Sequence, residues 1–93
     1  MKKYEFNGIE YELIKDDAQI FDVNDISGLI TDYFKDFDYI FGDIAYNKIR
    51  LKGFCDKNNK KFNNINDIST LDNYIENYCA FNCKWFLLKK HNN

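Results

Sequence analysis

The residues best suited to bind a charged ligand form a short basic row, Lys48, Arg50 and Lys52. Alternate residues of a β-strand point to the same face, so a strand here would place three cations about 7 Å apart. This spacing matches the reach of successive phosphates, and Tyr46 and Phe54 lie close enough in sequence to stack on bases. Arg50 is the single arginine of the chain, which indicates planar, bidentate contact with a carboxylate or a phosphate.

The same row has a structural interpretation. A hairpin predicted near the start of the chain carries Glu5, Glu10 and Glu12 on one face. If the two hairpins are neighbours in the sheet, these carboxylates would form cross-strand ion pairs with the row. The strand order decides between a binding surface and an internal ion-pair network, and the sequence leaves that order open.

A nuclease-like metal site is a third interpretation of this region. In restriction-endonuclease-like nucleases, a strand aspartate and an acid-x-Lys triplet on the next strand hold Mg²⁺ and assist an attacking water. Asp43 and Lys52 fit two of these positions, but Arg50 stands where the second carboxylate is needed. A cation there opposes a metal ion, so we predict no catalytic residue, no metal and no cofactor.

Cysteine chemistry and acid–base chemistry are also disfavoured. The three cysteines, Cys55, Cys79 and Cys83, are an odd number without a C-x-x-C knuckle, which indicates reduced thiols instead of disulfides or a zinc site. The one histidine, His91, lies in a tail expected to fray from about residue 90 to 93. Asp38 and Asp43 would lie at opposite ends of a short strand, which favours turn-forming roles.

Composition limits the class of protein. The chain has 93 residues, a formal net charge of -2 and 18% aromatic residues, which predicts one domain over 1–93 with its own core and no global basic field. The N-terminal segment alternates polar and apolar residues, unlike a signal peptide. No apolar run approaches the roughly 20 residues of a membrane span. We therefore expect a cytoplasmic protein that does not contact a membrane.

The elements that must position the row follow from hydrophobic periodicity. Asn7-Gly8 between alternating segments predicts a β-hairpin with a type I′ turn. Apolar residues at helical spacing predict one amphipathic helix over 22–37, with Asp22 or Asn24 as its N-cap. Strands are expected at 38–42 and 48–54, paired antiparallel across a loop that contains residues 43–46.

The C-terminal third predicts a helix and a last strand. Ser69 is expected to cap a helix with an apolar stripe from Leu71 to Cys79, and Asn82 suits a left-handed C-terminal cap. "KWFLLK" has apolar residues on both faces, which is typical of an interior strand. The resulting order is ββαββαβ, an α+β fold with a mainly antiparallel sheet covered by two helices.

Three blocks in this order, "FDYIFGD", "IRLKGF" and "ISTLDNYIENYCAFNC", resemble the YutD-like family of small bacterial proteins. The resemblance covers roughly Gly8 to Leu88 and implies a small cytoplasmic α+β protein, without catalytic residues to carry over. Two departures are visible. Ile44 and Ala45 stand where members have Trp-Gly, which removes an aromatic side chain beside the basic row, and Asn82 replaces a glycine.

From these features we expect a nonenzymatic binding module whose surface is made by Tyr46, Lys48, Arg50 and Lys52. Its partner would be RNA, in a ribosomal setting, or an acidic protein surface, with affinity that falls as salt rises. A second hypothesis is a protein-interaction or homodimerisation module that uses an aromatic surface, because aromatic residues are abundant in so short a chain. A degenerate nuclease-like enzyme is the third.

Overall fold

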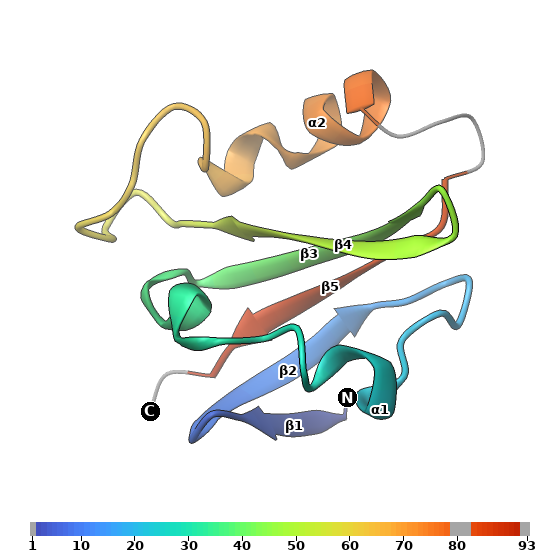
Figure 1. Cartoon of the computed structure of the whole chain (residues 1–93). Coiled ribbons are helices and arrows are strands. Elements are labelled where there is room, and N and C mark those ends of the chain that lie inside the picture. Colours follow the sequence, from blue (N-terminus) through green and yellow to red (C-terminus); the bar gives the residue numbers. More distant parts are fainter. Residues whose placement is uncertain (1, 79–82, 92–93) are drawn as a thin grey trace.

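The computed structural model describes residues 2–78 and 83–91, and its elements are arranged around one five-stranded sheet (Figure 1). In chain order they are β1 (Lys3–Phe6), β2 (Ile9–Lys15), α1 (Val23–Ile26), the 3₁₀ helix η1 (Asp32–Asp36), β3 (Tyr39–Ala45), β4 (Lys48–Phe54), the 3₁₀ helix η2 (Ile68–Thr70), α2 (Leu71–Tyr78) and β5 (Trp85–Lys90). This is the α+β class expected from the sequence, with strands predominating.

The strands lie in the order β1-β2-β5-β3-β4, and all these neighbours are antiparallel. The last strand of the chain, β5, is therefore inserted between the two hairpins. Its interior position was predicted from its apolar residues on both faces, but its place between the hairpins was not. Lys90 belongs to β5 and the His91 N–H donates to the Glu10 carbonyl over 2.8 Å. Lys90 and His91 are therefore held against β2 instead of belonging to the tail expected from about residue 90. The remaining residues of that expected tail, 92–93, lie outside the described residues.

The helices cover opposite faces of the sheet. On one face, α1 and η1 contribute Ile26 and Phe34 to a core cluster with Phe86 and Leu88 of β5. On the other face, α2 packs Tyr74 and its neighbours over a smaller cluster made by Phe41, Phe54 and Leu87. The aromatic residues of this chain thus build two cores, one on each side of a single sheet.

Two glycines bring aromatic rings against the sheet on the α1 side. A Cβ at Gly42 would overlap the ring of Phe86, and a Cβ at Gly53 would overlap the ring of Phe37. Both positions therefore need glycine because a ring occupies the space that any side chain would require.

The single helix predicted over 22–37 is wrong. Asp22 does cap a helix, since its side chain accepts from the Asn24 N–H over 2.8 Å, but α1 ends after one turn at Ile26. Ser27 and Gly28 are poor helix formers, and Thr31 is extended before η1 begins. Ile26, Ile30 and Phe34 are buried nonetheless. The hydrophobic periodicity therefore predicted which residues face the core, but not that the helix is interrupted between α1 and η1.

The helix after the long loop begins earlier than predicted. Asp67, not Ser69, is the N-cap, and its carboxylate accepts from the Ser69 N–H over 2.9 Å and from the Ser69 hydroxyl over 2.8 Å. The reason is that η2 adds a 3₁₀ turn ahead of α2. The predicted stripe residue Cys79 and the cap at Asn82 lie outside the described residues.

Candidate functional site

The β3–β4 hairpin positions the basic row. Lys48, Arg50 and Lys52 share one face of β4, the face that α2 partly covers. The predicted loop over 43–46 is wrong, because β3 continues to Ala45 and the turn consists of Tyr46 and Asn47 alone. The longer strand places Asp43 directly opposite Arg50.

Asp43 and Arg50 form a bidentate ion pair. The Arg50 Nη2 donates to Asp43 Oδ2 over 2.6 Å, and its Nε donates to Oδ1 over 3.1 Å. The Asp43 side chain is only 3% exposed, whereas that of Arg50 is 50% exposed. The planar geometry inferred from the single arginine is therefore used within the chain, on a buried carboxylate.

The acidic hairpin does not neutralise the row. Glu5, Glu10 and Glu12 lie on β1 and β2, which are separated from β4 by β5 and β3. Glu12 is paired in register with Lys3 and Lys89. The cross-strand interpretation with the first hairpin is thus wrong, because β5 is inserted between the hairpins.

Tyr46 occupies an unusual backbone position. Tyr46 and Asn47 have φ of 53° and 63°, the left-handed conformation that a type I′ turn requires at both central residues. This conformation suits Asn and Gly, and it costs a bulky residue roughly 1 kcal/mol. The Tyr46 side chain is 97% exposed, so no contact within the described residues accounts for a tyrosine there. Strained and exposed, it is a candidate binding residue.

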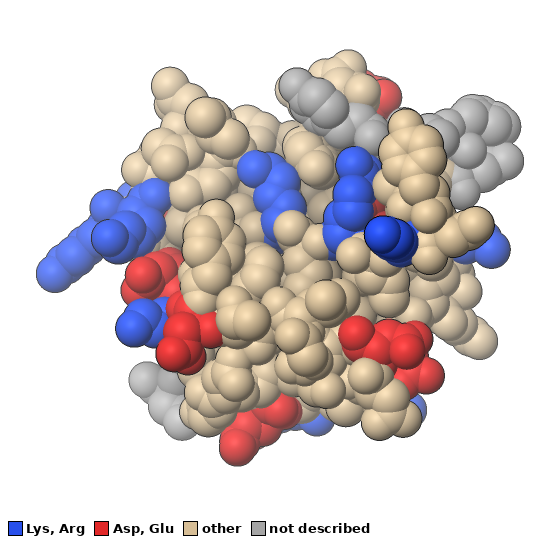
Figure 2. Space-filling view, viewed as in Figure 1, with Lys and Arg blue, Asp and Glu red and all other residues tan. Residues whose placement is uncertain are grey.

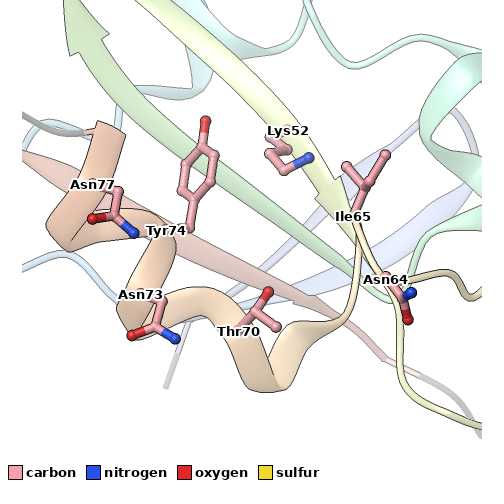
Figure 3. Close-up of a pocket in the computed structure, with 7 residues that line it drawn as sticks. All are labelled: Lys52, Asn64, Ile65, Thr70, Asn73, Tyr74 and Asn77. Carbon is pink, nitrogen blue, oxygen red and sulfur yellow. The ribbon is translucent and has the colours of Figure 1, made fainter.

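Lys52 borders a hollow between β4 and α2 (Figure 3). Its ammonium lies 5.1 Å from the Phe54 ring centre and 5.5 Å from that of Tyr74, which is cation–π distance. The hollow measures about 320 Å³ and is otherwise lined mainly by polar side chains. These lining residues are Asn64, Ile65, Thr70, Asn73, Tyr74 and Asn77.

The polar residues of η2 and α2 that line this hollow were not identified from the sequence. Thr70, Asn73 and Asn77 recur at helical spacing, but a stripe of uncharged polar residues is the ordinary outer face of an amphipathic helix. In the structure, Tyr74 packs against Phe41 and Phe54, and this contact turns the stripe toward Lys52.

The two aspartates considered for metal or acid–base chemistry, Asp43 and Asp38, both have partners within the chain. Asp43 is held through both carboxylate oxygens by a cation, where a nuclease would hold a metal ion. Asp38 accepts from the Asp56 N–H and the Asn59 side chain, so it orders the turn after β4. In the part of the chain that the structure describes, no group of three metal-ligating side chains comes together.

Cys55 is inaccessible at the end of β4. It is 0% exposed, and burial raises the pKa of its thiol, with the Asp38 carboxylate adding to the shift. A raised pKa keeps the thiol protonated and unreactive. His91 lies beside Glu10, with 3.8 Å between Nε2 and Oε1, rather than serving a thiol. Among the described residues, no helix is both long and apolar enough to cross a bilayer.

A small α+β protein with a basic edge strand is the class that the fold and the site define. The family model described as "Putative antitoxin YutD-like" matches residues 5–89. The chain is 41% identical over 81 residues to "Putative antitoxin YutD" of Bacillus subtilis (strain 168), which covers 87% of this chain and 89% of that relative.

A solved structure agrees with this match. The solution NMR structure of protein yutD from B. subtilis is similar with a TM-score of 0.81 and 35% identity, over 100% of this chain and 84% of that one. The chain therefore belongs to the YutD-like family, as the three sequence blocks indicated.

Proposed function

We propose that this chain is a nonenzymatic binding module that engages an acidic protein partner through Tyr46, Lys48, Arg50 and Lys52. The observation that carries the proposal is the place of this row on β4, an edge strand that β5 and β3 separate from the acidic hairpin. A row at the sheet edge is open to a partner, and the exposed Tyr46 stands directly beside it at the turn.

An acidic protein fits the surface better than RNA does. The Asp43 carboxylate lies in the middle of the row and offsets the charge of Arg50, while the formal net charge of the chain is -2. RNA binding of low specificity depends on many phosphate contacts and a clear positive field. Two lysines flanking a neutralised arginine suit a short acidic segment, where a few directed contacts suffice.

The relatives' printed description supports a binding role. The family and the B. subtilis relative are both described as putative antitoxins, a description that implies a partner of some kind. This description supports a role in binding a partner, and the acidic character that we propose for the partner comes from the basic row alone.

Homodimerisation through an aromatic surface loses the observation that motivated it. Most described rings are in the two cores, including the fully buried Phe54 and Phe86. Among the residues whose burial is described, the strongly exposed rings are Tyr33 and Tyr46, which lie on η1 and on the β3–β4 turn. The abundance of aromatic residues is thus a property of the core.

Affinity purification of the tagged full chain from lysate, with and without RNase, tests the proposal. We expect a protein partner that survives RNase and is lost in Lys48→Glu. The matched control is Lys60→Glu, which makes the same charge change at an exposed residue of the 56–67 loop. RNase-sensitive recovery would move the assignment to RNA, and equal recovery with both variants would contradict the proposed surface.

A further inference from the structure

We infer that the outer edge of β4 accepts an extended segment of the partner as an added β-strand, in which acidic residues alternate with apolar ones. The inference rests on the proposed function and names the kind of segment that this surface recognises.

The position of β4 in the sheet supports this inference. β4 is the last strand in the sheet order, and β3 is the strand paired with it among the described elements. In a hairpin with a two-residue turn, the backbone N–H and C=O groups of the flanking pair, here Ala45 and Lys48, normally bond to each other across the two strands. Because these groups alternate in direction along a strand, the N–H and C=O groups of Ile49 and Leu51 point away from β3. Outward N–H and C=O groups are a template for an added strand.

The open stretch has a defined end. The loop after β4 returns beside its C-terminal half, where Asn63, Ile65 and Asn66 line a hollow together with Leu51 and Gly53. Beyond the strand, the Cys55 N–H donates to the Asn66 carbonyl over 2.7 Å. The loop therefore occupies the far end of the edge, and the stretch from Lys48 to Leu51 is the part left for a partner.

The two sides of β4 differ in chemistry. On the α2 side, a hollow of about 240 Å³ is lined by Lys52, Tyr74 and Arg50, together with the Asp43 carboxylate that Arg50 binds. On the α1 side, a hollow of about 260 Å³ is lined by the rings of Tyr33 and Phe37 and by Leu51 and Ile65, with polar side chains of the loop after β4 at its border. Successive side chains of an added strand point alternately to these two sides. Acidic residues would meet the cations, and apolar residues would meet the aromatic and aliphatic side chains.

The charged side chains are also distributed unevenly over the surface. Figure 2 shows basic side chains along the upper part of this face, an uncharged band across its centre, and most acidic side chains below the band. Such a surface favours an acidic strand by charge and excludes a basic one.

A second copy of this chain fits the edge poorly. Antiparallel pairing of β4 with another β4 would place the cations of one row opposite those of the other, which is destabilising. The opposite edge strand, β1, carries Lys3 as well as Glu5 on its charged face, so it offers one favourable contact and one unfavourable one. A segment of a different protein is therefore the occupant we infer.

Two synthetic peptides test the edge directly. The ¹⁵N-labelled full chain is titrated with a nine-residue peptide alternating glutamate and valine, and with a control alternating lysine and valine. We expect shift changes and slowed amide exchange centred on Ile49 and Leu51 with the acidic peptide only. Changes centred on β1, equal response to both peptides, or no response at millimolar peptide would overturn the inference.

A charge reversal sharpens this test. The double variant Lys48→Glu, Lys52→Glu should bind the acidic peptide about tenfold more weakly, because two favourable cross-strand pairs become unfavourable. The same variant should gain binding to the lysine–valine peptide. A variant that keeps the original preference would contradict the role of the row.

A backbone change separates this inference from the proposed function. Ile49→Pro removes one outward N–H, and Ile49→Ala shortens the same side chain but keeps that N–H. With both variants shown to be folded by their ¹⁵N spectra, capture of the lysate partner should fall in Ile49→Pro and persist in Ile49→Ala. If Lys48→Glu abolishes capture but Ile49→Pro does not, the edge inference fails while the proposed function stands.

Discussion

Arg50 and Asp43 face each other across β4 and β3 and share two hydrogen bonds of 3.1 and 2.6 Å. The pair places a buried carboxylate in the middle of the basic row, which accounts for an arginine in a chain that otherwise uses lysine. It also leaves Lys48 and Lys52 as the cations that flank a locally neutral centre. The character of this surface, and our preference for an acidic protein partner, follow from that pair.

Loss of Arg50 should destabilise the fold. Arg50→Met removes two charge-assisted hydrogen bonds from a carboxylate that is 3% exposed, and we expect a loss of about 2 kcal/mol. This lies below the 3–5 kcal/mol typical of fully buried pairs because Arg50 is half exposed. Urea unfolding measures the change.

A second variant tests the physical cause of that loss. Adding Asp43→Asn to Arg50→Met should recover part of the stability, because the buried charge is removed along with its partner. If Arg50→Met were neutral, or if the double variant were the less stable by the sum of both single changes, the pair would not contribute in the way described.

Gly42 should not tolerate a side chain. A Cβ there would overlap the fully buried ring of Phe86, so Gly42→Ala should cost about 3 kcal/mol or prevent folding. Gly28→Ala is the control, because nothing lies within 4 Å of its added Cβ, and it should change stability by less than about 0.5 kcal/mol. Thermal unfolding of both variants decides this, and similar melting temperatures would refute the packing of Phe86 on Gly42.

Replacing the residues of the β3–β4 turn should raise stability and weaken binding of the partner. Tyr46→Asn with Asn47→Gly gives residues suited to the φ values of 53° and 63°, and we expect a gain of about 1 kcal/mol in stability. The same change removes the exposed tyrosine, so capture of the partner should fall. A variant that is more stable and captures the partner as well as the parent would exclude Tyr46 from the surface.

Stability should decline in alkaline solution. Burial raises the pKa of the Cys55 thiol above its ordinary value of 9.0 and that of the Tyr11 phenol above 10.0. These groups contribute stability that is fully present below those ordinary values. It is lost as pH rises, because the unfolded chain releases its protons first.

Urea unfolding at a series of pH values from about 8 to 10.5 checks this sign. The free energy of unfolding should fall above about pH 9, and Cys55→Ala should reduce the slope just above that point. If the free energy of unfolding of the parent stayed constant over this pH range, burial of Cys55 and Tyr11 would not control its stability in alkaline solution.

Local signals in the sequence predicted local structure well. The hairpin at Asn7-Gly8 is confirmed by φ of 53° and 79°, because a type I′ turn depends on two adjacent residues. The interior strand at β5 is confirmed because apolar residues on both faces need cover on both faces. The family resemblance is confirmed by the family model.

Relationships between distant segments were not predictable in the same way. Periodicity in 22–37 identified Ile26 and Phe34 as core residues but could not report the break after one helical turn, because the same residues are buried with or without it. The insertion of β5 between the hairpins, which separates Glu10 from Arg50, depends on packing across the whole sheet. The partner of Arg50 was missed for a local reason, because residues 43–46 were predicted as a loop, whereas β3 continues through Asp43 to Ala45.

The most direct test of the central claim compares Lys48→Glu with Lys60→Glu in capture of the partner from RNase-treated lysate. Both variants make the same charge change at an exposed lysine, but only one alters the basic row on β4. We predict that a protein partner is lost with Lys48→Glu and kept with Lys60→Glu. Equal capture by the two variants, or a partner that disappears on RNase treatment alone, would contradict it.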